Sequence, residues 1–276
     1  MEIRLESSQA ETAGMDTDAL RSNFLVQSLM QAGKIHLVYT HYDRMILGGV
    51  MPVDTAVELK ADAELRATCF LERREIGIIN VGGPGIIEAD GKIFKTSKLD
   101  CVYLGKGTKA VSFKSIDKDQ PAQYYLLSTP AHAVYENTIC KKEDAMPVNL
   151  GSTATGNVRT IYKYIHLNGI KSCQLVMGLT VLEEGSVWNS VPPHTHTRRT
   201  EAYFYFDLAE DQRLFHFMGL PQQTRHIVAK NHEAVISPSW SVHFGCGTMN
   251  YGFIWAMAGE NQAFDDMDAA PVNSLL

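Results

Sequence analysis

The stretch that decides the fold reads PHTHTRRTEAYFYFDL and spans residues 193–208. His194 and His196 are two residues apart, and residues i and i+2 of a β-strand point to the same face of the sheet. Both imidazoles can therefore meet at one point. After a short polar turn, Glu201 opens an aromatic strand in which Tyr203 and Tyr205 share its face. The pattern predicts β-structure with a polar cluster in its interior.

A second segment, SPSWSVHFG (237–245), adds His243 from another strand after Pro238. Three imidazoles and one carboxylate are suitable donors for zinc, manganese, iron or nickel. Because no thiolate accompanies them, the pattern favours a site open to substrate over a purely structural zinc site. Ordinary polar strand residues are the alternative interpretation of the histidines, and the combined spacing favours the metal.

The rest of the chain consists mostly of short apolar or alternating runs separated by turn residues, which indicates an all-β sandwich or barrel. Asp90-Gly91 lies between two alternating runs and predicts a β-hairpin. One helix is expected over 16–33, with Asp16 or Thr17 as its N-cap and Gly33 at its end.

A polar segment, 137–157, nearly bisects the chain and predicts a linker between two halves. Superposing Glu75 on Glu201 aligns the segment from Thr68 with the segment from His194, and Lys109 then falls opposite His243. We interpret this as a duplicated β-domain, with a half at 1–145 that lacks the metal site and a half at 146–276 that carries it. Two unrelated β segments are the alternative.

Composition narrows the possible partners. The net charge of -6 gives no basic surface for nucleic acid or anionic membranes, although a local pocket can still bind a small anion. The five cysteines are scattered without a CxxC pair, which favours a reducing compartment. No signal peptide is recognisable, and no apolar run approaches the ~18 residues of a membrane span. We expect a cytoplasmic protein that binds neither nucleic acid nor membrane.

The two histidine motifs resemble those of the cupin superfamily, and the whole chain resembles one family within it, the 5-keto-4-deoxyuronate isomerases. The segments that carry this resemblance are FLERREIGIINVGG (70–83), CQLVMGLT (173–180), HTHTRRTEAYFYF (194–206), QQTRHIV (222–228), AVISPSWSVHFGCGT (234–248) and FIWAMAGENQAFDDMD (253–268). Gln223 departs from the pattern, which has a glutamate at that position.

The resemblance implies a bicupin of two β-barrel or jelly-roll halves with a short N-terminal helix. It implies one Zn²⁺ per chain in the C-terminal barrel, a homohexamer, and His194, His196, Glu201 and His243 as metal ligands. The implied activity is the interconversion of 5-dehydro-4-deoxy-D-glucuronate and 3-deoxy-D-glycero-2,5-hexodiulosonate during the breakdown of pectin and related uronates.

Moving a carbonyl along a sugar acid requires a base next to a polarised carbonyl. Glu201 and Tyr203 are the candidate catalytic residues. Arg159, Lys163 and Arg199 are candidates to bind the substrate carboxylate, because a cation must balance it. A cupin dioxygenase with the same ligands and a non-enzymatic sugar-acid-binding cupin remain as alternatives.

Overall fold

The computed structural model describes residues 1–276, which divide into two compact units. Unit 1 comprises Met1–Arg4, Ser28–Met146 and Tyr164–Met177. Unit 2 comprises Leu5–Gln27, Pro147–Lys163 and Gly178–Leu276. The chain passes from unit 1 to unit 2 after Met146, which lies in the segment expected to be a linker. The assignment of 1–145 and 146–276 as the two halves of a repeat stays a prediction.

Unit 1 is built on a seven-stranded and a four-stranded sheet. The larger sheet has the order β1 (Glu2–Arg4), β3 (Ile35–Thr40), β4 (Ile46–Val50), β11 (Tyr124–Pro130), β6 (Arg74–Asn80), β9 (Cys101–Leu104) and β12 (Thr138–Cys140). The smaller has the order β5 (Val57–Glu58), β10 (Val111–Ser115), β7 (Gly85–Ala89) and β8 (Lys92–Thr96). The expected hairpin at Asp90-Gly91 is confirmed: it joins β7 to β8, and both turn residues have positive φ.

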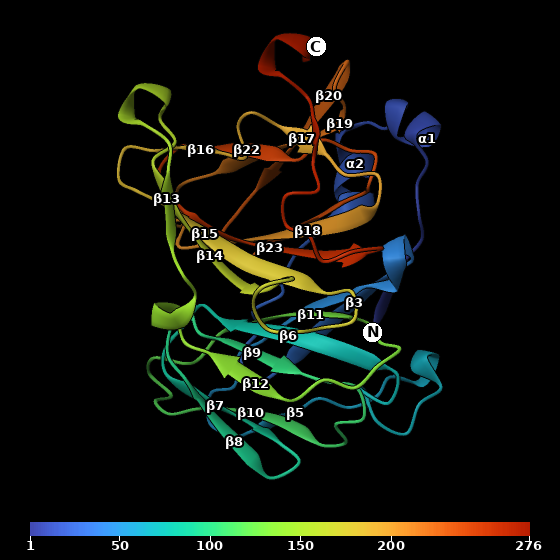
Figure 1. Ribbon diagram of the computed structural model, residues 1–276, viewed down its shortest axis with the longest axis vertical. Helices are drawn as coiled ribbons and strands as arrows, with labels where there is room; N and C mark the ends of the chain where they lie inside the picture. Colours follow the sequence, from blue (N-terminus) through green and yellow to red (C-terminus); the bar gives the residue numbers. More distant parts are fainter. The chain divides into compact units, whose positions relative to one another are not determined.

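Unit 2 repeats this arrangement, and Figure 1 shows its two layers of strands. The larger sheet has the order β13 (Val148–Leu150), β14 (Arg159–Ile165), β15 (Val176–Leu182), β23 (Gly252–Gly259), β18 (Arg199–Phe206), β21 (Ala234–Ser237) and β2 (Leu25–Val26). The smaller has the order β16 (Trp188–Asn189), β22 (Phe244–Gly247), β19 (Leu214–Leu220) and β20 (Gln223–Ala229). A separate pair joins β17 (His194–Thr195) to β24 (Asp268–Ala269).

These sheets confirm the predicted all-β fold with two jelly-roll halves. Alternation along the strands produces the cores: in β6, Ile76 and Ile78 belong to a buried cluster together with Leu126 from the adjacent β11 and Phe113 from the smaller sheet. In β18 the same alternation turns Glu201 inward and the next residue outward. The sandwich therefore presents one face of β18 to its interior, where polar groups are expensive unless they are paired.

The expected N-terminal helix is present but shorter than predicted. α2 covers Thr17–Phe24, and the Asp16 carboxylate accepts the N–H of Ala19 as its N-cap. The helix ends before Gly33 because the following Leu25–Val26 pairs with β21 as a strand. A short helix, α1 (Gln9–Ala13), was missed although Ser8 and Glu11 form a capping box. Figure 1 shows both helices in blue beside β19 and β20, far away in sequence.

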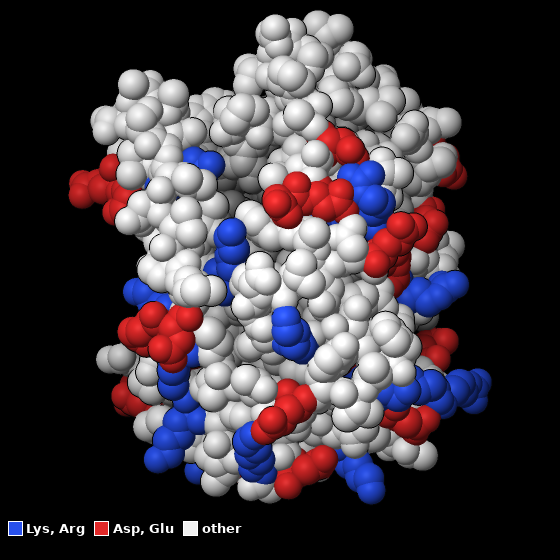
Figure 2. All heavy atoms as spheres, viewed as in Figure 1, with Lys and Arg blue, Asp and Glu red and all other residues white.

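Short 3₁₀ turns complete the structure at η1 (Tyr42–Arg44), η2 (Ala63–Leu65), η3 (Lys142–Asp144), η4 (Thr153–Thr155) and η5 (Val272–Ser274). None of the helices has both the length and the apolar character that a membrane crossing requires. On the face drawn in Figure 2, acidic and basic side chains are interspersed without a continuous basic area.

The register proposed for the repeat pairs two residues that lie on opposite faces of their strands. Glu75 lies on the face of β6 opposite to the core, where its carboxylate accepts the backbone N–H groups of Cys173, Gln174 and Leu175. The inward-facing residue next to it is Ile76, which belongs to the unit 1 core. Because neighbouring residues of a strand point to opposite faces, Glu75 and the inward-facing Glu201 do not occupy equivalent positions.

Candidate metal centre

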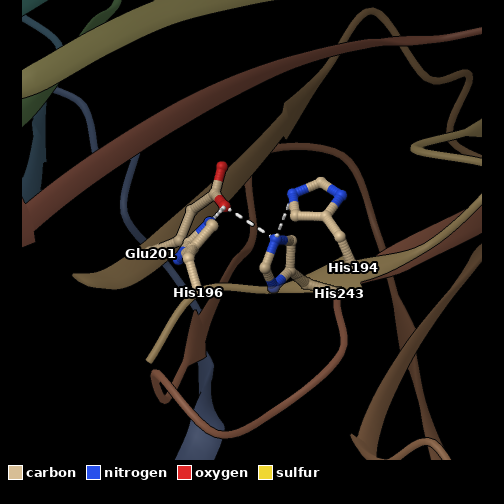
Figure 3. Close-up of side chains that lie close together, drawn as sticks. All are labelled: His194, His196, Glu201 and His243. Carbon is tan, nitrogen blue, oxygen red and sulfur yellow. Dashed lines mark hydrogen bonds and ion pairs between the residues drawn. The ribbon is translucent and has the colours of Figure 1, made fainter. Parts of the chain in front are cut away.

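Four side chains from separate segments of unit 2 converge inside the sandwich. His194 lies on β17, His196 follows it, Glu201 lies near the start of β18, and His243 directly precedes β22. Figure 3 shows all four pointing toward one another. One potential ligand atom from each lies within 4.8 Å of the others, and three of the residues are buried. The structure thus brings the four predicted ligand residues together, and their role as metal ligands stays a prediction.

The surroundings of His196 determine which ring nitrogen carries a proton. Its Nδ1 lies 3.0 Å from the carbonyl oxygen of Arg199, so Nδ1–H donates there. In the neutral ring, Nε2 is then a lone-pair acceptor. That atom lies 3.1 Å from Oε2 of Glu201, which is itself an acceptor when ionised.

His243 repeats this arrangement. Its Nδ1 lies 3.2 Å from both the carbonyl oxygen of Ser241 and the hydroxyl of Ser237. Donation to the carbonyl leaves Nε2 as an acceptor, 2.9 Å from Oε2 of Glu201 and 3.1 Å from Nε2 of His194. Lone pairs thus face lone pairs at the centre of the group.

A cation between these atoms removes the repulsion, because each lone pair then becomes a ligand. The donor set of three imidazoles and a carboxylate fits a divalent transition metal. Burial lowers the pKa of His194 to about 3, helped by the neighbouring His243. Burial alone would raise the pKa of Glu201, but His243 and His196 beside it hold it well below its usual range. Both residues are thus in the protonation states that bind metal.

A cavity of about 230 Å³ opens onto this group. His194, His196 and Glu201 line it together with Tyr203 and Arg159. The Glu201 Oε1 atom makes no hydrogen bond, unlike Oε2. Tyr203 donates or accepts a hydrogen bond of 2.8 Å with the Ser190 hydroxyl, and burial raises the pKa of its phenol well above 10. The cavity thus combines the candidate metal ligands with a protonated phenol.

The three predicted carboxylate-binding cations occupy different environments. Arg159 lines the cavity; its Nη1 donates to the carbonyl of Asn157, and it forms no ion pair. Lys163 does not line the cavity, and its Nζ lies 4.4 Å from the ring centre of Phe264. Arg199 does not line it either: it is buried, Nη2 donates to the carbonyl of Asp266, and Nε and Nη1 have no partner. The structure therefore brings Arg159 alone of the three to the cavity wall, and the substrate roles of all three stay predictions.

Sequence reasoning missed much of the apolar wall. Trp255 is buried and also lines the cavity; its Nε1 donates to the Thr180 hydroxyl. Gly178 allows this, since a Cβ there would lie 2.2 Å from the indole ring. Alternation along 252–259 could have placed Trp255 on the inner face. Phe264 and Met267 line the cavity from a coil segment that carries no comparable signal.

That coil segment is tied to the metal motif by ion pairs. Arg198 lies 2.7 Å from the carboxylate of Asp266 and 2.9 Å from that of Asp268. Hydrogen bonds from Arg198 and Asn261 lower the pKa of Asp266 to about 2. The segment that carries Phe264 and Met267 is thereby held near His194, whose strand pairs with β24.

Behind Tyr203 lies a buried histidine that sequence analysis did not consider. The Nδ1 of His216 lies 2.6 Å from the hydroxyl of Tyr205, and its Nε2 has no partner. Burial, together with the nearby His243, lowers the pKa of His216 to about 3. His216 is therefore neutral in the folded protein at ordinary pH.

Two jelly-roll units, one of which encloses a group of three histidines and a glutamate, define a protein of the two-barrel cupin class. Solved structures agree with this fold. An IolB-like protein from Salmonella typhimurium LT2 superposes with a TM-score of 0.67 at 13% identity over 87% of this chain and 94% of that one. The oxalate decarboxylase of Lactobacillus farciminis superposes with a TM-score of 0.55 at 8% identity, over 79% of this chain and 77% of that one.

The chain belongs to the KduI/IolB family, whose model matches residues 24–272. Two relatives with the name 4-deoxy-L-threo-5-hexosulose-uronate ketol-isomerase, from Shouchella clausii and Halalkalibacterium halodurans, are each 50% identical over 275 residues and cover all of both chains.

Proposed function

We propose that the protein is a metal-dependent ketol isomerase that interconverts 5-dehydro-4-deoxy-D-glucuronate and 3-deoxy-D-glycero-2,5-hexodiulosonate. The observation that carries this is the convergence of lone pairs from His194, His196, His243 and Glu201 beside a cavity. The assignment of the substrate is based on the relatives that carry the ketol-isomerase name. Two of them are 50% identical to this chain over 275 residues.

We assign one Zn²⁺ per chain to the four ligands. Nitrogen and oxygen donors without thiolate, with room left for substrate, are typical of catalytic zinc. A divalent cation bound there supplies a Lewis acid that polarises the substrate carbonyl and offsets negative charge developing on its oxygen. Zinc does so without redox chemistry.

The reaction moves one proton from the hydroxyl-bearing carbon to the former aldehyde carbon, and one from the hydroxyl oxygen to the former aldehyde oxygen. A base removes the first proton from the hydroxyl-bearing carbon next to the aldehyde, and the same proton or one from solvent returns to the former aldehyde carbon. We assign the base to Glu201 Oε1, which makes no hydrogen bond while Oε2 faces the histidines. Tyr203 keeps its phenolic proton because of burial, and it donates a hydrogen bond to a substrate oxygen.

Arg159 is the proposed partner of the substrate carboxylate. It lines the cavity, and its guanidinium has a single neutral acceptor, the carbonyl of Asn157. A guanidinium can hold a carboxylate through two parallel hydrogen bonds. The apolar wall of Trp255, Phe264 and Met267 excludes water from the reacting carbons, which protects the intermediate between the two proton transfers.

The proposal extends to the setting of the enzyme. The family resemblance implies a role in the degradation of pectin and related uronates and a homohexameric assembly. We propose a cytoplasmic location, because the five scattered cysteines without a CxxC pair favour a reducing compartment.

Turnover of enzymatically generated 5-dehydro-4-deoxy-D-glucuronate by the purified protein tests the proposal. We expect turnover that a chelator removes and zinc restores. Oxygen uptake with substrate would instead identify a dioxygenase, and saturable binding without turnover in any metal form would identify a binding protein; either result overturns the proposal.

A further inference from the structure

Unit 1 contains a cavity of about 410 Å³ that the proposed isomerase chemistry does not use. It lies at the end of the sandwich where β6 begins and β3 and β11 end, and Arg74, Tyr39 and Pro130 line it from these strands. Arg74 is the first inward-facing residue of β6, just as Arg199 is the first of β18. The cavity therefore occupies the end of unit 1 that corresponds to the metal-centre end of unit 2.

Arg74 is a buried cation without an anionic partner. Only 7% of its surface is exposed. Its Nε donates to the Ser128 hydroxyl at 3.0 Å, and Nη2 donates to the carbonyl oxygens of Arg44 at 2.7 Å and Ser128 at 2.9 Å. All three acceptors are neutral, and Arg74 forms no ion pair. Its Nη1 has no hydrogen-bond partner, and it is not among the polar atoms sealed away from accessible space.

Such an arrangement is costly for stability alone. A charge moved out of water loses its hydration, and neutral acceptors replace only part of it. Burial lowers the pKa of Arg74 to about 10, so the side chain is still a cation at neutral pH. Folding therefore keeps a positive charge in a concave site with one donor aimed at open space, an arrangement more typical of ligand binding than of a core.

The walls resemble those of a small-molecule pocket. The Tyr39 ring lies 5.9 Å from the Arg74 guanidinium carbon, and the buried Phe70 adds a second aromatic surface. His41 at the rim contributes a polar ring next to Tyr39. Mostly apolar walls with a few convergent polar groups are the usual pattern for ligand sites of roughly 300–1,000 Å³.

The charged side chains that line the cavity determine which anions it can bind. Arg73 also lines the cavity, but its Nη1 lies 2.7 Å from the Glu72 carboxylate, so its charge is balanced. Glu64 lines the cavity as well and disfavours a doubly charged ligand. Arg74 is then the one cation in the lining without a neighbouring carboxylate, and the volume exceeds the needs of a bare inorganic ion.

We propose that the unit 1 cavity is a second ligand site, which binds a small organic monocarboxylate of sugar-acid size through Arg74. The carboxylate accepts the free Nη1–H of Arg74, and the hydroxylated remainder lies against Tyr39 and Phe70. The site lies in a different unit from the metal centre, so the proposal stands or falls independently of the isomerase activity.

Calorimetry with D-glucuronate as the probe tests the site. The titrated protein carries His194→Ala and Arg159→Met, which silence the unit 2 cavity. We expect saturable binding with a stoichiometry of one per chain, and none for the uncharged D-glucose at the same concentration. Adding Arg74→Met should weaken binding at least tenfold, since the carboxylate loses its charge-assisted hydrogen bond.

A second variant covers the case in which Arg74→Met fails to fold. Ala67 lines the cavity from the partly exposed 66–69 segment, so Ala67→Trp fills the space without removing a hydrogen bond. We expect the same loss of binding. Undiminished glucuronate binding in both variants, no saturable binding in their parent, or equally tight binding of inorganic phosphate would each overturn the proposal. So would a crystal structure in which an acidic side chain of a second copy pairs with Arg74.

Discussion

Nε2 of His196 lies 3.1 Å from Oε2 of Glu201, while Nδ1 of the same ring lies 3.0 Å from the carbonyl oxygen of Arg199. The carbonyl fixes the proton on Nδ1, so Nε2 and the carboxylate face each other as two acceptors. Nε2 of His243 faces the same carboxylate oxygen of Glu201 at 2.9 Å. This mutual orientation is unfavourable without a cation, and it is the physical basis for the metal site.

Replacing one ligand should remove the metal. His243→Ala deletes the imidazole that lies closest to both Glu201 and His194. We expect loss of bound zinc and at least a thousandfold loss of turnover, since a Lewis acid contributes several kcal/mol, with tenfold in rate for each 1.4 kcal/mol. Metal analysis by mass spectrometry checks the first expectation.

Lys109→Ala is the matched control for this experiment. The sequence alignment set Lys109 opposite His243, but the structure places it in unit 1, where it lines a surface groove. Its zinc content and turnover should equal those of the unchanged protein. Loss of a metal equivalent in this variant would contradict the assignment of a single site.

Tyr203→Phe should separate catalysis from metal binding. The variant loses only the hydroxyl that bonds to Ser190, and the ring stays next to His243. We expect kcat to fall about 10²- to 10⁴-fold with zinc retained, as is usual for a lost proton donor. Tyr205→Phe is the control, because the Tyr205 hydroxyl bonds to His216 outside the cavity. Equal effects in the two variants would argue for a packing role.

Arg159→Met should act on substrate affinity. Losing a charge-assisted hydrogen bond costs about 1.5–3 kcal/mol, so KM should rise roughly 10- to 100-fold. Steady-state kinetics measures this directly. We expect a smaller change for Lys163→Met, because the Lys163 ammonium lies over Phe264 rather than in the cavity wall. A larger rise in KM for Lys163→Met than for Arg159→Met would instead identify Lys163 as the residue that binds the substrate carboxylate.

His216 should make the metal-free protein sensitive to acid. Its folded-state pKa of about 3 lies below the ordinary value of 6.5, so the unfolded chain takes up this proton first as pH falls. The stability contribution is present above pH 6.5 and is lost as pH falls toward 3, by about 2 kcal/mol between pH 7 and pH 5. Urea unfolding in the presence of chelator should show a flatter pH dependence for His216→Gln. Parallel profiles would mean that His216 is not the titrating group.

The sequence was sufficient for the parts of the site that depend on strand alternation. His194 and His196 had to share a direction, and Glu201 and Tyr203 had to share a face, because a strand has a period of two. The fold class followed from the same alternation and from turn residues such as Asp90-Gly91.

Features that depend on tertiary pairing were not accessible in this way. The helix at Thr17–Phe24 ends early because Leu25 and Val26 find strand partners more than 200 residues away. The Glu75 register failed because both Glu75 and Ile76 are buried, so hydrophobic patterning could not distinguish the two faces. The burial of Arg199, whose guanidinium donates to the Asp266 carbonyl, also depends on tertiary structure, and the substrate role of Arg199 stays a prediction.

The most direct test of the central claim is a zinc titration of the chelated protein, with turnover of 5-dehydro-4-deoxy-D-glucuronate measured at each step. Turnover that rises linearly and reaches its plateau at one zinc per chain is the expected result. Full turnover before any zinc is added, or none at any zinc content, would contradict the account.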